Sequence, residues 1–312
     1  MKVLIWQTAY LGDVVLATSL LQNTLEIFGD YNVGFVGKPF INDLFYGYPV
    51  NLHPYDKTLK GSFGILKAIK TYDAVLSLHV SLRTAVILYT SGIKRRISFD
   101  RSEGKFFYTD LVPYQKSGIH EIQRNIKLLE LLVSKPVVPK PPKLFIENAF
   151  QDATRSKFKL PSSFVVVSPL SNFYLKTWKQ DYFIELSKNL EKPVVILSDK
   201  SLKAFDNIKN VLNLSGLTSL KEFLALISMS DIVISNDSSS VHIANAFGKK
   251  AISIYCATSS SYGFYPMLGD YLEPKLSCHP CSINPKSCKT NTYACLDYIK
   301  PKDVLKILKT LS

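Results

Sequence analysis

The stretch DIVISNDSSSVHIANAFG, residues 231–248, decides the fold of this chain. Its β-branched run at 231–235 is typical of a buried strand, and the segment at 241–247 has the pattern of a helix that ends at the glycine. Asp237 or Ser238 is the expected N-cap of that helix. A strand that passes directly into a helix is the repeating unit of a parallel α/β sheet.

Three serines, Ser238, Ser239 and Ser240, follow Asp237 at the start of this helix. The N–H groups of a first turn and the helix dipole attract anions, and small side chains let a diphosphate approach the backbone. The turn therefore predicts a phosphate site at the carboxyl end of a parallel strand, where open α/β sheets place their ligands. An ordinary capped helix explains the same residues.

A second strand-to-helix unit has the same layout. The expected strand at 164–167 is followed by a long loop at 168–177 and by a helix that begins at Trp178. A loop of this length indicates a binding role. Lys176 is its strong cation, and a compact ammonium suits the neutralisation of a leaving diphosphate. The alternative for Lys176 is a solvated surface lysine.

The amino terminus carries a third motif. A buried-type strand at 3–6 precedes Gly12 and Asp13, and a helix follows at 14–28. A carboxylate at the tip of the first strand can act as a general base. The same carboxylate can instead cap the helix. Both interpretations of Asp13 stay open.

Strands and helices alternate along the whole chain, which predicts two parallel sheets covered by helices. The expected strands lie at 3–6, 32–36, 73–78, 164–168, 193–198, 231–235 and 250–255, and the expected helices at 14–28, 62–71, 120–133, 178–189, 218–228 and 238–247. A proline-rich stretch at 135–142, followed by a charged helix near 148–158, marks the domain boundary. We therefore expect one domain at 1–147 and a second at 148–312.

Several motifs together resemble those of one known family. They include Leu11-Gly12-Asp13-Val14-Val15-Leu16, Lys176-Thr177-Trp178, Asn236-Asp237-Ser238 with His242, and Cys278-His279-Pro280-Cys281. In order and spacing they are similar to the ADP-heptose:lipopolysaccharide heptosyltransferases, glycosyltransferase family 9, and closest to the heptosyltransferase II branch. The resemblance runs from about residue 2 to about residue 306. It implies a GT-B fold, in which two Rossmann-like α/β domains face each other across a cleft and the last helix can return to the first domain.

The resemblance also implies roles for individual residues. Asp13 is the implied general base, and Lys176 is the implied cation for the leaving group. The implied nucleotide-sugar-binding residues are Ser171, Asn172, Asp199, Asp237, Ser238, Ser239 and His242. The implied acceptor-binding residues are Gly12, His79, Ser81, Arg83, Arg95 and Arg96. Two structural alternatives stay open. His242 can be a histidine packed within its helix, and the arginines can form a solvated basic face.

The chain departs from the family pattern at three places. The family usually has glycine at Ser239, and Pro-Gly-Ala where this chain has Pro169-Leu170-Ser171. Near Asp199 the family often carries two glycines and a glutamate at the position that holds the ribose. Asp199 is the acidic residue of this chain in that stretch.

The implied reaction is an inverting, single-displacement transfer of L-glycero-D-manno-heptose. ADP-heptose is the implied donor, and the lipid A–Kdo core of lipopolysaccharide is the implied acceptor, through either Kdo or the first heptose. No cofactor and no catalytic metal are implied. Two alternatives stay open: a related transferase with another nucleotide sugar or polysaccharide acceptor, and a catalytically silent nucleotide-sugar-binding protein.

Composition agrees with a globular protein of two domains. The chain has 312 residues, of which 46% are hydrophobic and 20% charged, a balance that excludes extended disorder. No apolar run reaches the ~18 residues of a membrane-spanning helix. The first residues enter a strand without the layout of a signal peptide. We therefore expect a cytoplasmic protein.

The net charge of +13 favours anionic partners. No nucleic-acid-binding motif accompanies this charge, so we expect no nucleic acid and instead a peripheral position on the inner face of the cytoplasmic membrane. All six arginines precede residue 156. Because guanidinium groups grip phosphates and carboxylates, the first half is the better candidate for binding an anionic acceptor.

Five cysteines complete the sequence pattern. Cys256 follows an expected strand and is interpreted as a buried apolar residue. Cys278, Cys281, Cys288 and Cys295 have the spacing C-x2-C-x6-C-x6-C. Such thiols can hold a structural zinc, form disulfides or stay free, and free thiols are the preferred interpretation because the usual second C-x2-C pair is missing. A zinc-dependent interaction protein is thus a third alternative.

Overall fold

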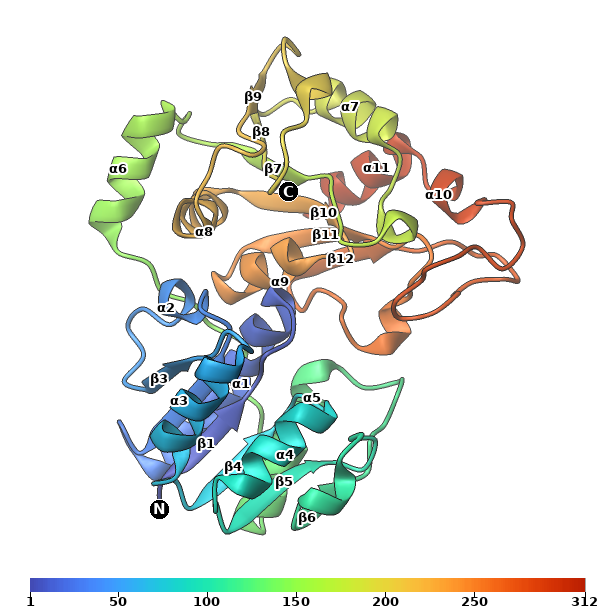
Figure 1. Ribbon diagram of the computed structural model, residues 1–312. Coiled ribbons are helices and arrows are strands. Elements are labelled where there is room, and N and C mark those ends of the chain that lie inside the picture. Colours follow the sequence, from blue (N-terminus) through green and yellow to red (C-terminus); the bar gives the residue numbers. More distant parts are fainter. Residues whose placement is uncertain (312) are drawn as a thin grey trace. The chain divides into compact units, whose positions relative to one another are not determined.

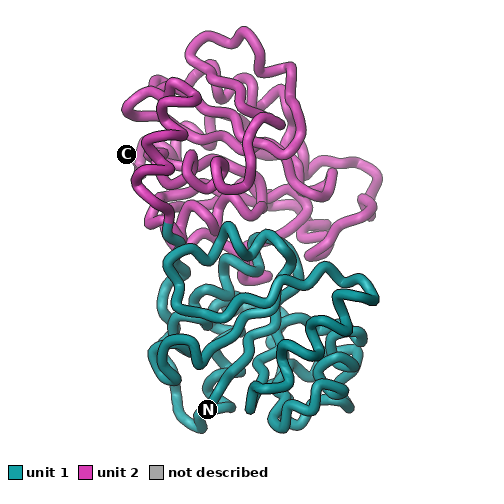
Figure 2. The backbone as a smooth tube through the Cα atoms, turned by 60° about the vertical axis from the view of Figure 1, so that its left-hand side comes forward, with its two compact units in different colours: residues 1–145 teal, residues 146–312 magenta. Residues whose placement is uncertain are grey.

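The chain divides into two compact units, Met1–Phe145 and Ile146–Ser312 (Figure 2), and the computed structural model describes residues 1–311. Each unit holds one six-stranded sheet whose successive strands are connected mostly by helices (Figure 1). Neighbouring strands of both sheets pair in parallel. The predicted α/β class with two parallel sheets is confirmed.

Unit 1 alternates strands and helices from its first residues onward. Its elements are β1 (Val3–Trp6), α1 (Leu11–Phe28), β2 (Val33–Gly37), α2 (Ile41–Leu44), β3 (Asn51–Pro54), α3 (Leu59–Ile69), β4 (Ala74–Ser77), α4 (Leu82–Thr90), β5 (Arg95–Phe99), η1 (Lys105–Phe107), β6 (Asp110–Val112) and α5 (Glu121–Val133). The strand order is β3-β2-β1-β4-β5-β6. β1 and β4 are buried along their whole length, because helices on both faces of a parallel sheet shield its central strands from water.

Two helix pairs cover the sheet of unit 1. α1 packs against α5, and α3 packs against α4. On the side of α3 and α4, Ile65 and Ile69 of α3 belong to the same buried cluster as Leu4 and Trp6 of β1. The buried residues of α3 thus recur every four positions, which is the spacing of one helix face.

Unit 2 repeats this plan. Its elements are α6 (Asn148–Phe158), β7 (Val165–Ser168), η2 (Tyr174–Lys176), α7 (Gln180–Asn189), β8 (Val194–Ile196), η3 (Lys203–Phe205), β9 (Val211–Asn213), α8 (Leu220–Met229), β10 (Ile232–Asn236), α9 (Ser239–Ala246), β11 (Lys250–Ile254), η4 (Ser260–Tyr262), β12 (Gly269–Leu272), α10 (Cys295–Tyr298) and α11 (Pro301–Leu311). The strand order is β12-β11-β10-β7-β8-β9. Counted from its own first strand, this sheet has the same order as the sheet of unit 1.

That order fixes where ligands can bind. In doubly wound sheets the connections from the first and fourth strands leave toward opposite faces, which opens a ligand position at the carboxyl ends of those strands. The strands in question are β1 and β4 in unit 1, and β7 and β10 in unit 2. We define the unit 1 edge as the connections 7–13, 38–40, 55–58 and 78–83, and the unit 2 edge as the connections 169–179, 197–202, 237–240 and 255–261.

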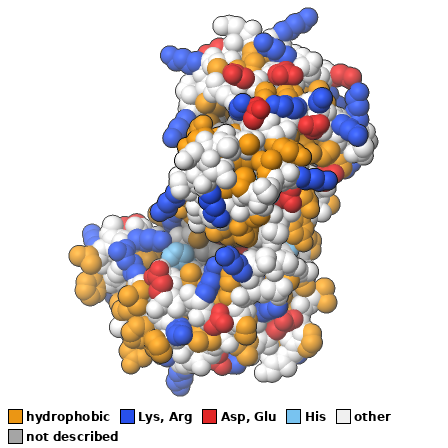
Figure 3. Space-filling view, turned by 90° about the vertical axis from the view of Figure 1, so that its right-hand side faces the viewer, with side chains coloured by type: hydrophobic (Ala, Val, Ile, Leu, Met, Phe, Trp, Pro, Cys, Tyr) orange, Lys and Arg blue, Asp and Glu red, His pale blue; other side chains and the backbone are white. Residues whose placement is uncertain are grey.

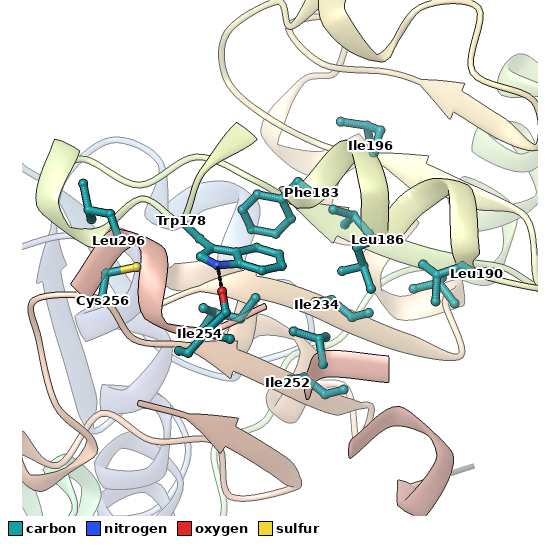
Figure 4. Packing of buried hydrophobic residues seen from close by; sticks show 14 of the residues in the cluster. Trp178, Phe183, Leu186, Leu190, Ile196, Ile234, Ile252, Ile254, Cys256 and Leu296 are labelled. Atoms are coloured by element: carbon teal, nitrogen blue, oxygen red, sulfur yellow. Dashed lines mark hydrogen bonds between the residues drawn. The ribbon is translucent and has the colours of Figure 1, made fainter. Parts of the chain in front are cut away.

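Trp178 lies in the core on one side of unit 2 (Figure 4). Its ring is fully buried and packs edge-on against Phe183, with 4.8 Å between the ring centroids. Its indole N–H donates to the backbone carbonyl of Ile299 at 2.9 Å. A buried indole with a satisfied N–H has one stable orientation, so this tryptophan holds the end of the loop that precedes α7.

The structure differs from the sequence predictions at several elements. The strands β3, β5, β6, β9 and β12 were not among those predicted, and neither were the helices α2, α4 and α10. α11 packs against α7 and β11 and belongs to unit 2. Within residues 1–311, no helix combines the length and the apolarity that crossing a membrane requires.

Candidate active site

The unit 2 edge brings together the two motifs that dominate the sequence. β7 and β10 are neighbours, with Val165 opposite Ile232 and Ser168 opposite Ser235. The loop at 169–179 and the turn after β10 therefore start side by side, although they are far apart in the sequence. This is the place where a sheet of this order binds its ligands.

Lys176 and Asp237 form an ion pair at this edge. The distance between Lys176 Nζ and Asp237 Oδ2 is 2.8 Å, and the two side chains are only 14% and 11% exposed. Thr258, in the connection after β11, donates its hydroxyl to the same carboxylate oxygen at 2.9 Å. Lys176 is therefore not a solvated surface lysine. Because an ammonium has three N–H donors, Lys176 can bind a phosphate oxygen while Asp237 holds it in position.

Asn236 explains why the loop at 169–179 takes this course. Its side chain is fully buried. The side-chain amide donates to the carbonyl of Pro169 at 2.7 Å and accepts the backbone N–H of Trp178 at 2.8 Å. One side chain thus holds both ends of the loop, with Lys176 between them. The signal for this role in the sequence is the position of Asn236 at the end of a buried strand, next to Asp237.

The serines at the start of α9 have mostly structural partners. Ser238, not Asp237, is the N-cap: its hydroxyl accepts the N–H of Ser240 at 3.3 Å. It also bonds the hydroxyl of Ser235 at 2.7 Å. Ser239, the first residue of α9, is half-buried. An anion would therefore bind to the backbone N–H groups and the dipole of this first turn, with Ser239 beside them.

The remaining donor-side residues lie in different surroundings. Ser171 donates its hydroxyl to the backbone carbonyl of Asp237 at 3.4 Å. Asn172 is exposed and lines a pocket of about 480 Å³. Asp199 follows β8 and is also exposed. His242 is buried within α9, an environment that fits the alternative of a packed helix histidine.

At the unit 1 edge, Asp13 lies in the first turn of α1 and is half-buried. Its carboxylate accepts the backbone N–H of Tyr10 at 3.2 Å, so the capping interpretation is confirmed. Capping does not exclude a role as a base, because a carboxylate has lone pairs for about four hydrogen bonds. Gly12 precedes it in the same turn and is also half-buried.

Glu121 is a functional candidate that the sequence analysis missed. It begins α5, which packs against α1, and it is only 6% exposed. Burial raises the pKa of Glu121 to about 7, and the Asp13 carboxylate adds to this rise, whereas Arg124 opposes it. Arg124 is fully buried and pairs with Glu121. The signal available in the sequence was Glu121 and Arg124 on one helix face, three residues apart.

His79, Ser81 and Arg83 also lie at the unit 1 edge, after β4. His79 Nδ1 is 3.1 Å from the hydroxyls of both Ser81 and Thr84. Burial, then Lys57 and Lys38, lowers the pKa of His79 to about 4. His79 is therefore neutral near pH 7. It can form hydrogen bonds with a bound ligand but carries no charge.

Two lysines add positive charge to this edge. Lys38 follows β2 and Lys57 follows β3, and Arg83 donates to the carbonyl of Lys57 at 2.8 Å. Burial, then Lys38 and Arg83, lowers the pKa of Lys57. Within residues 1–311, none of these three cations has a carboxylate within ion-pair distance. The edge thus concentrates positive charge that an anion can neutralise.

Arg95 and Arg96 are not brought to the unit 1 edge. They begin β5, at the amino end of the sheet. Arg95 donates to the carbonyls of Leu131 and Leu132 at 2.9 Å, and Arg96 donates to the carbonyl of Phe107 at 2.8 Å. Their guanidinium groups bond the backbone of neighbouring elements, so the alternative of a solvated basic face describes neither residue. Both lie at the opposite end of the sheet from Asp13.

The five cysteines are free thiols in the described chain. Burial raises the pKa of Cys256 far above its usual value, as expected of an apolar residue. Backbone and Thr290 hydrogen bonds lower the pKa of Cys288 to about 7. Within residues 1–311, no cluster of three or more His, Cys, Asp or Glu side chains is placed to hold a metal ion.

Comparison with known proteins places this geometry in a family. The model of glycosyltransferase family 9 (heptosyltransferase) matches residues 65–288. Lipooligosaccharide heptosyltransferase 2 of Campylobacter jejuni is 23% identical over 330 residues, which cover 100% of this chain and 99% of the relative.

Two solved structures share the fold. The ADP-heptose LPS heptosyltransferase II of E. coli has a TM-score of 0.79 at 21% identity, covering 100% of this chain and 98% of that one. A family 9 glycosyltransferase of Veillonella parvula has a TM-score of 0.82 at 18% identity, covering 99% and 96%. Both likenesses agree with the predicted GT-B type of fold. Because the family model covers more than half of its length, the chain belongs to glycosyltransferase family 9, the heptosyltransferases.

Proposed function

We propose that this protein transfers L-glycero-D-manno-heptose from ADP-heptose to the inner core of lipopolysaccharide, with inversion at the anomeric carbon. The observation that carries the proposal is the Lys176–Asp237 pair at the unit 2 edge, in a chain of the heptosyltransferase family. A half-buried cation held by a carboxylate suits a group that must meet a diphosphate in one fixed place.

Unit 2 is the proposed donor site. The diphosphate would lie against Lys176 and the first turn of α9, whose N–H groups and dipole attract anions. Ser171, Asn172 and Ser239 would add hydrogen bonds. Asp199, exposed after β8, is the proposed contact to the nucleotide ribose.

Unit 1 is the proposed acceptor site. The inner core carries carboxylates and phosphates, which suit the charges of Lys38, Lys57 and Arg83. His79 and Ser81 would bind sugar hydroxyls. Arg95 and Arg96 are left out of this site, because their guanidinium groups already bond backbone carbonyls at the other end of the sheet.

The proposed step is a single displacement. Asp13 takes the proton from the attacking acceptor hydroxyl, whose oxygen forms a bond to the anomeric carbon. The bond from that carbon to the β-phosphate oxygen breaks, and ADP leaves with the bonding electrons. Lys176 and the start of α9 stabilise the charge that grows on ADP. These residues supply the charge compensation, so we propose that no divalent metal takes part.

The transfer is tested by ADP release from ADP-heptose in the presence of heptose-deficient lipopolysaccharide core and EDTA. Acceptor-dependent release, with the heptosylated core seen by mass spectrometry, is the expected result. ADP-heptose binding without release would favour the silent binding protein. Release with another nucleotide sugar, and none with ADP-heptose, would favour the related transferase.

The acceptor also suggests where the enzyme works. Lipid-anchored core is accessible at a membrane surface, and a protein with a net charge of +13 is attracted to anionic lipid headgroups. We therefore propose a cytoplasmic enzyme that binds peripherally to the inner face of the cytoplasmic membrane.

A further inference from the structure

Unit 1 exposes large apolar side chains along one side, on α3, α4 and η1. Leu59 and Phe63 of α3 are 84% and 76% exposed, and Phe106 of η1 is 88% exposed. Leu82 and Tyr89 of α4 are also exposed. A single exposed apolar side chain is ordinary, whereas a contiguous group of them marks an interaction site.

These residues belong to one continuous surface. α3 packs against α4, and α4 packs against η1. The rings of Tyr89 and Phe107 are 5.2 Å apart, which joins α4 to η1. On unit 1, Figure 3 shows hydrophobic side chains directly beside Lys and Arg side chains. We name this area the α3–η1 surface and define it by Leu59, Lys60, Phe63, Lys67, Lys105 and Phe106.

Positive charge predominates on and around the α3–η1 surface, although the carboxylate of exposed Glu103, just before η1, accepts the backbone N–H of Leu82 at 3.0 Å. The segments 59–70, 82–90 and 105–107 contain Lys60, Lys67, Lys70, Arg83 and Lys105 and no aspartate or glutamate. On α3, Lys60, Phe63 and Lys67 are spaced three and four residues apart, so they share the exposed face. Lysines of this kind can keep their charge in water while their stems lie along an apolar surface.

We propose that the α3–η1 surface is the part of this protein that binds an anionic phospholipid membrane, with Phe63 and Phe106 inserted among the headgroups and lysines paired with lipid phosphates. The proposal deepens the peripheral location given under the proposed function and rests on it.

A membrane explains the combination better than a protein partner. The most exposed apolar side chains are surrounded by solvent, so a binding surface that deforms around them suits them better than a rigid one. A bilayer interface accepts aromatic and leucine side chains and attracts lysines through its anionic lipids. Each lysine near such a surface contributes roughly 1 kcal/mol, and the contribution falls as salt screens the charges.

The position of the surface fits the acceptor. α3 begins two residues after Lys57 and α4 directly after Ser81, so the first turns of both helices lie at the unit 1 edge. Arg83, in the first turn of α4, donates to the carbonyl of Lys57. An acceptor whose lipid part stays in the membrane would thus present its sugars next to the proposed acceptor site.

The test is co-sedimentation of the full chain with vesicles of phosphatidylglycerol and phosphatidylcholine in equal parts. We expect binding that weakens with added salt and with vesicles of phosphatidylcholine alone. Phe63→Ser with Phe106→Ser should weaken binding about tenfold or more, and Lys60→Ala with Lys67→Ala should weaken the salt dependence.

Matched controls lie elsewhere on the chain. Val138 is 86% exposed in unit 1 but lies outside the α3–η1 surface, so Val138→Ser should bind like the unchanged protein. Lys188→Ala with Lys209→Ala removes the same charge from exposed positions of unit 2 and should weaken binding less than Lys60→Ala with Lys67→Ala. Equal effects of the two lysine pairs would overturn the assignment to this surface.

Two further measurements separate this proposal from the transfer reaction. Turnover of a lipid-free core oligosaccharide should not change in Phe63→Ser with Phe106→Ser, whereas turnover of vesicle-embedded acceptor should fall. Vesicle binding by a protein without transferase activity would refute the proposed function and leave the surface intact. No vesicle binding, with a dimer in solution that the same variant dissociates, would assign the surface to a second copy and overturn the membrane proposal.

Discussion

The unit 1 edge and the unit 2 edge occupy the same position in two sheets of the same strand order, yet their charges are arranged in opposite ways. At the unit 2 edge the cation Lys176 is paired with Asp237 at 2.8 Å. At the unit 1 edge Lys38, Lys57 and Arg83 have no carboxylate partner within the described residues.

The difference teaches how one fold can hold two kinds of anion. A paired cation has a fixed position and little net charge, which suits the stabilisation of charge that appears on one leaving group during a reaction. Unpaired cations raise the local potential and attract a large, multiply charged ligand from solution. The same sheet topology therefore serves as a rigid donor site in unit 2 and an electrostatically attractive acceptor site in unit 1.

The largest expected effect is on turnover, and ADP affinity then distinguishes the unit 1 edge from the unit 2 edge. Asp13→Asn should lower turnover about a hundredfold or more while ADP affinity stays unchanged, because Asp13 belongs to the acceptor side. Lys176→Met should lower turnover by about 10²–10³-fold and weaken ADP binding as well. Steady-state ADP release and calorimetric titration with ADP measure both properties. Equal ADP affinities in the two variants would break the comparison.

The next effect concerns the two buried tryptophans, one in each unit. Within the described chain, the indole N–H of Trp6 has no hydrogen-bond partner, whereas that of Trp178 donates to Ile299. Trp178→Phe leaves that carbonyl without its donor, so it should cost about 1–3 kcal/mol more unfolding free energy than Trp6→Phe. Urea unfolding followed by circular dichroism gives both values. A larger loss in Trp6→Phe would mean that the Trp178 hydrogen bond does not hold the donor loop.

A smaller effect is expected from the unpaired lysines. Lys38→Met with Lys57→Met should raise the KM for the core acceptor about tenfold, and should leave the KM for ADP-heptose within a factor of about two. The acceptor KM of the unchanged protein should also depend more steeply on salt than that of the variant. Lys2→Met with Lys94→Met removes equal charge from exposed positions at the amino ends of β1 and β5, the opposite end of the same sheet, and serves as the control. A variant whose donor KM rises instead would assign these lysines to ADP-heptose.

The last expected effect, confined to acidic solution, is a pH dependence of the stability of unit 1. His79 has a pKa near 4 in the folded protein, below its value near 6.5 in an unfolded chain. The unfolded chain therefore takes up the proton first, so this residue lowers the free energy of unfolding as pH falls from about 6.5 to about 4. His79→Gln should lose less stability than the unchanged protein over this range. If the free energy of unfolding falls equally with pH in both proteins, His79 is not held neutral in the folded state.

The central strands could be predicted from the sequence, and the outer strands could not. β1, β7 and β10 are continuous apolar runs, which is what a strand covered on both faces requires. β3 and β12 lie at the ends of their sheets and are half polar, so no apolar run marks them.

The candidate site could be predicted in part for a related reason. Lys176 and Asp237 each follow a recognisable strand, so their edge was predictable, but their pairing depends on β7 and β10 being neighbours. Predicting the contact of Thr258 with Asp237 would also have required the position of β11. The acceptor role of Arg95 rested on the family resemblance. Arg95 is the first residue of β5, a strand that was not predicted, and therefore lies at the amino end of the sheet, opposite the acceptor edge. Glu121 escaped because its link to Asp13 depends on the packing of α1 against α5.

The central claim is that the unit 2 edge holds the donor diphosphate, and a crystal structure of the protein with ADP tests it most directly. The account predicts a phosphate oxygen within hydrogen-bond distance of Lys176 Nζ and of the first turn of α9, with Asp237 still paired to Lys176. Density for the diphosphate at Lys38, Lys57 and Arg83, with the unit 2 edge empty, would contradict it.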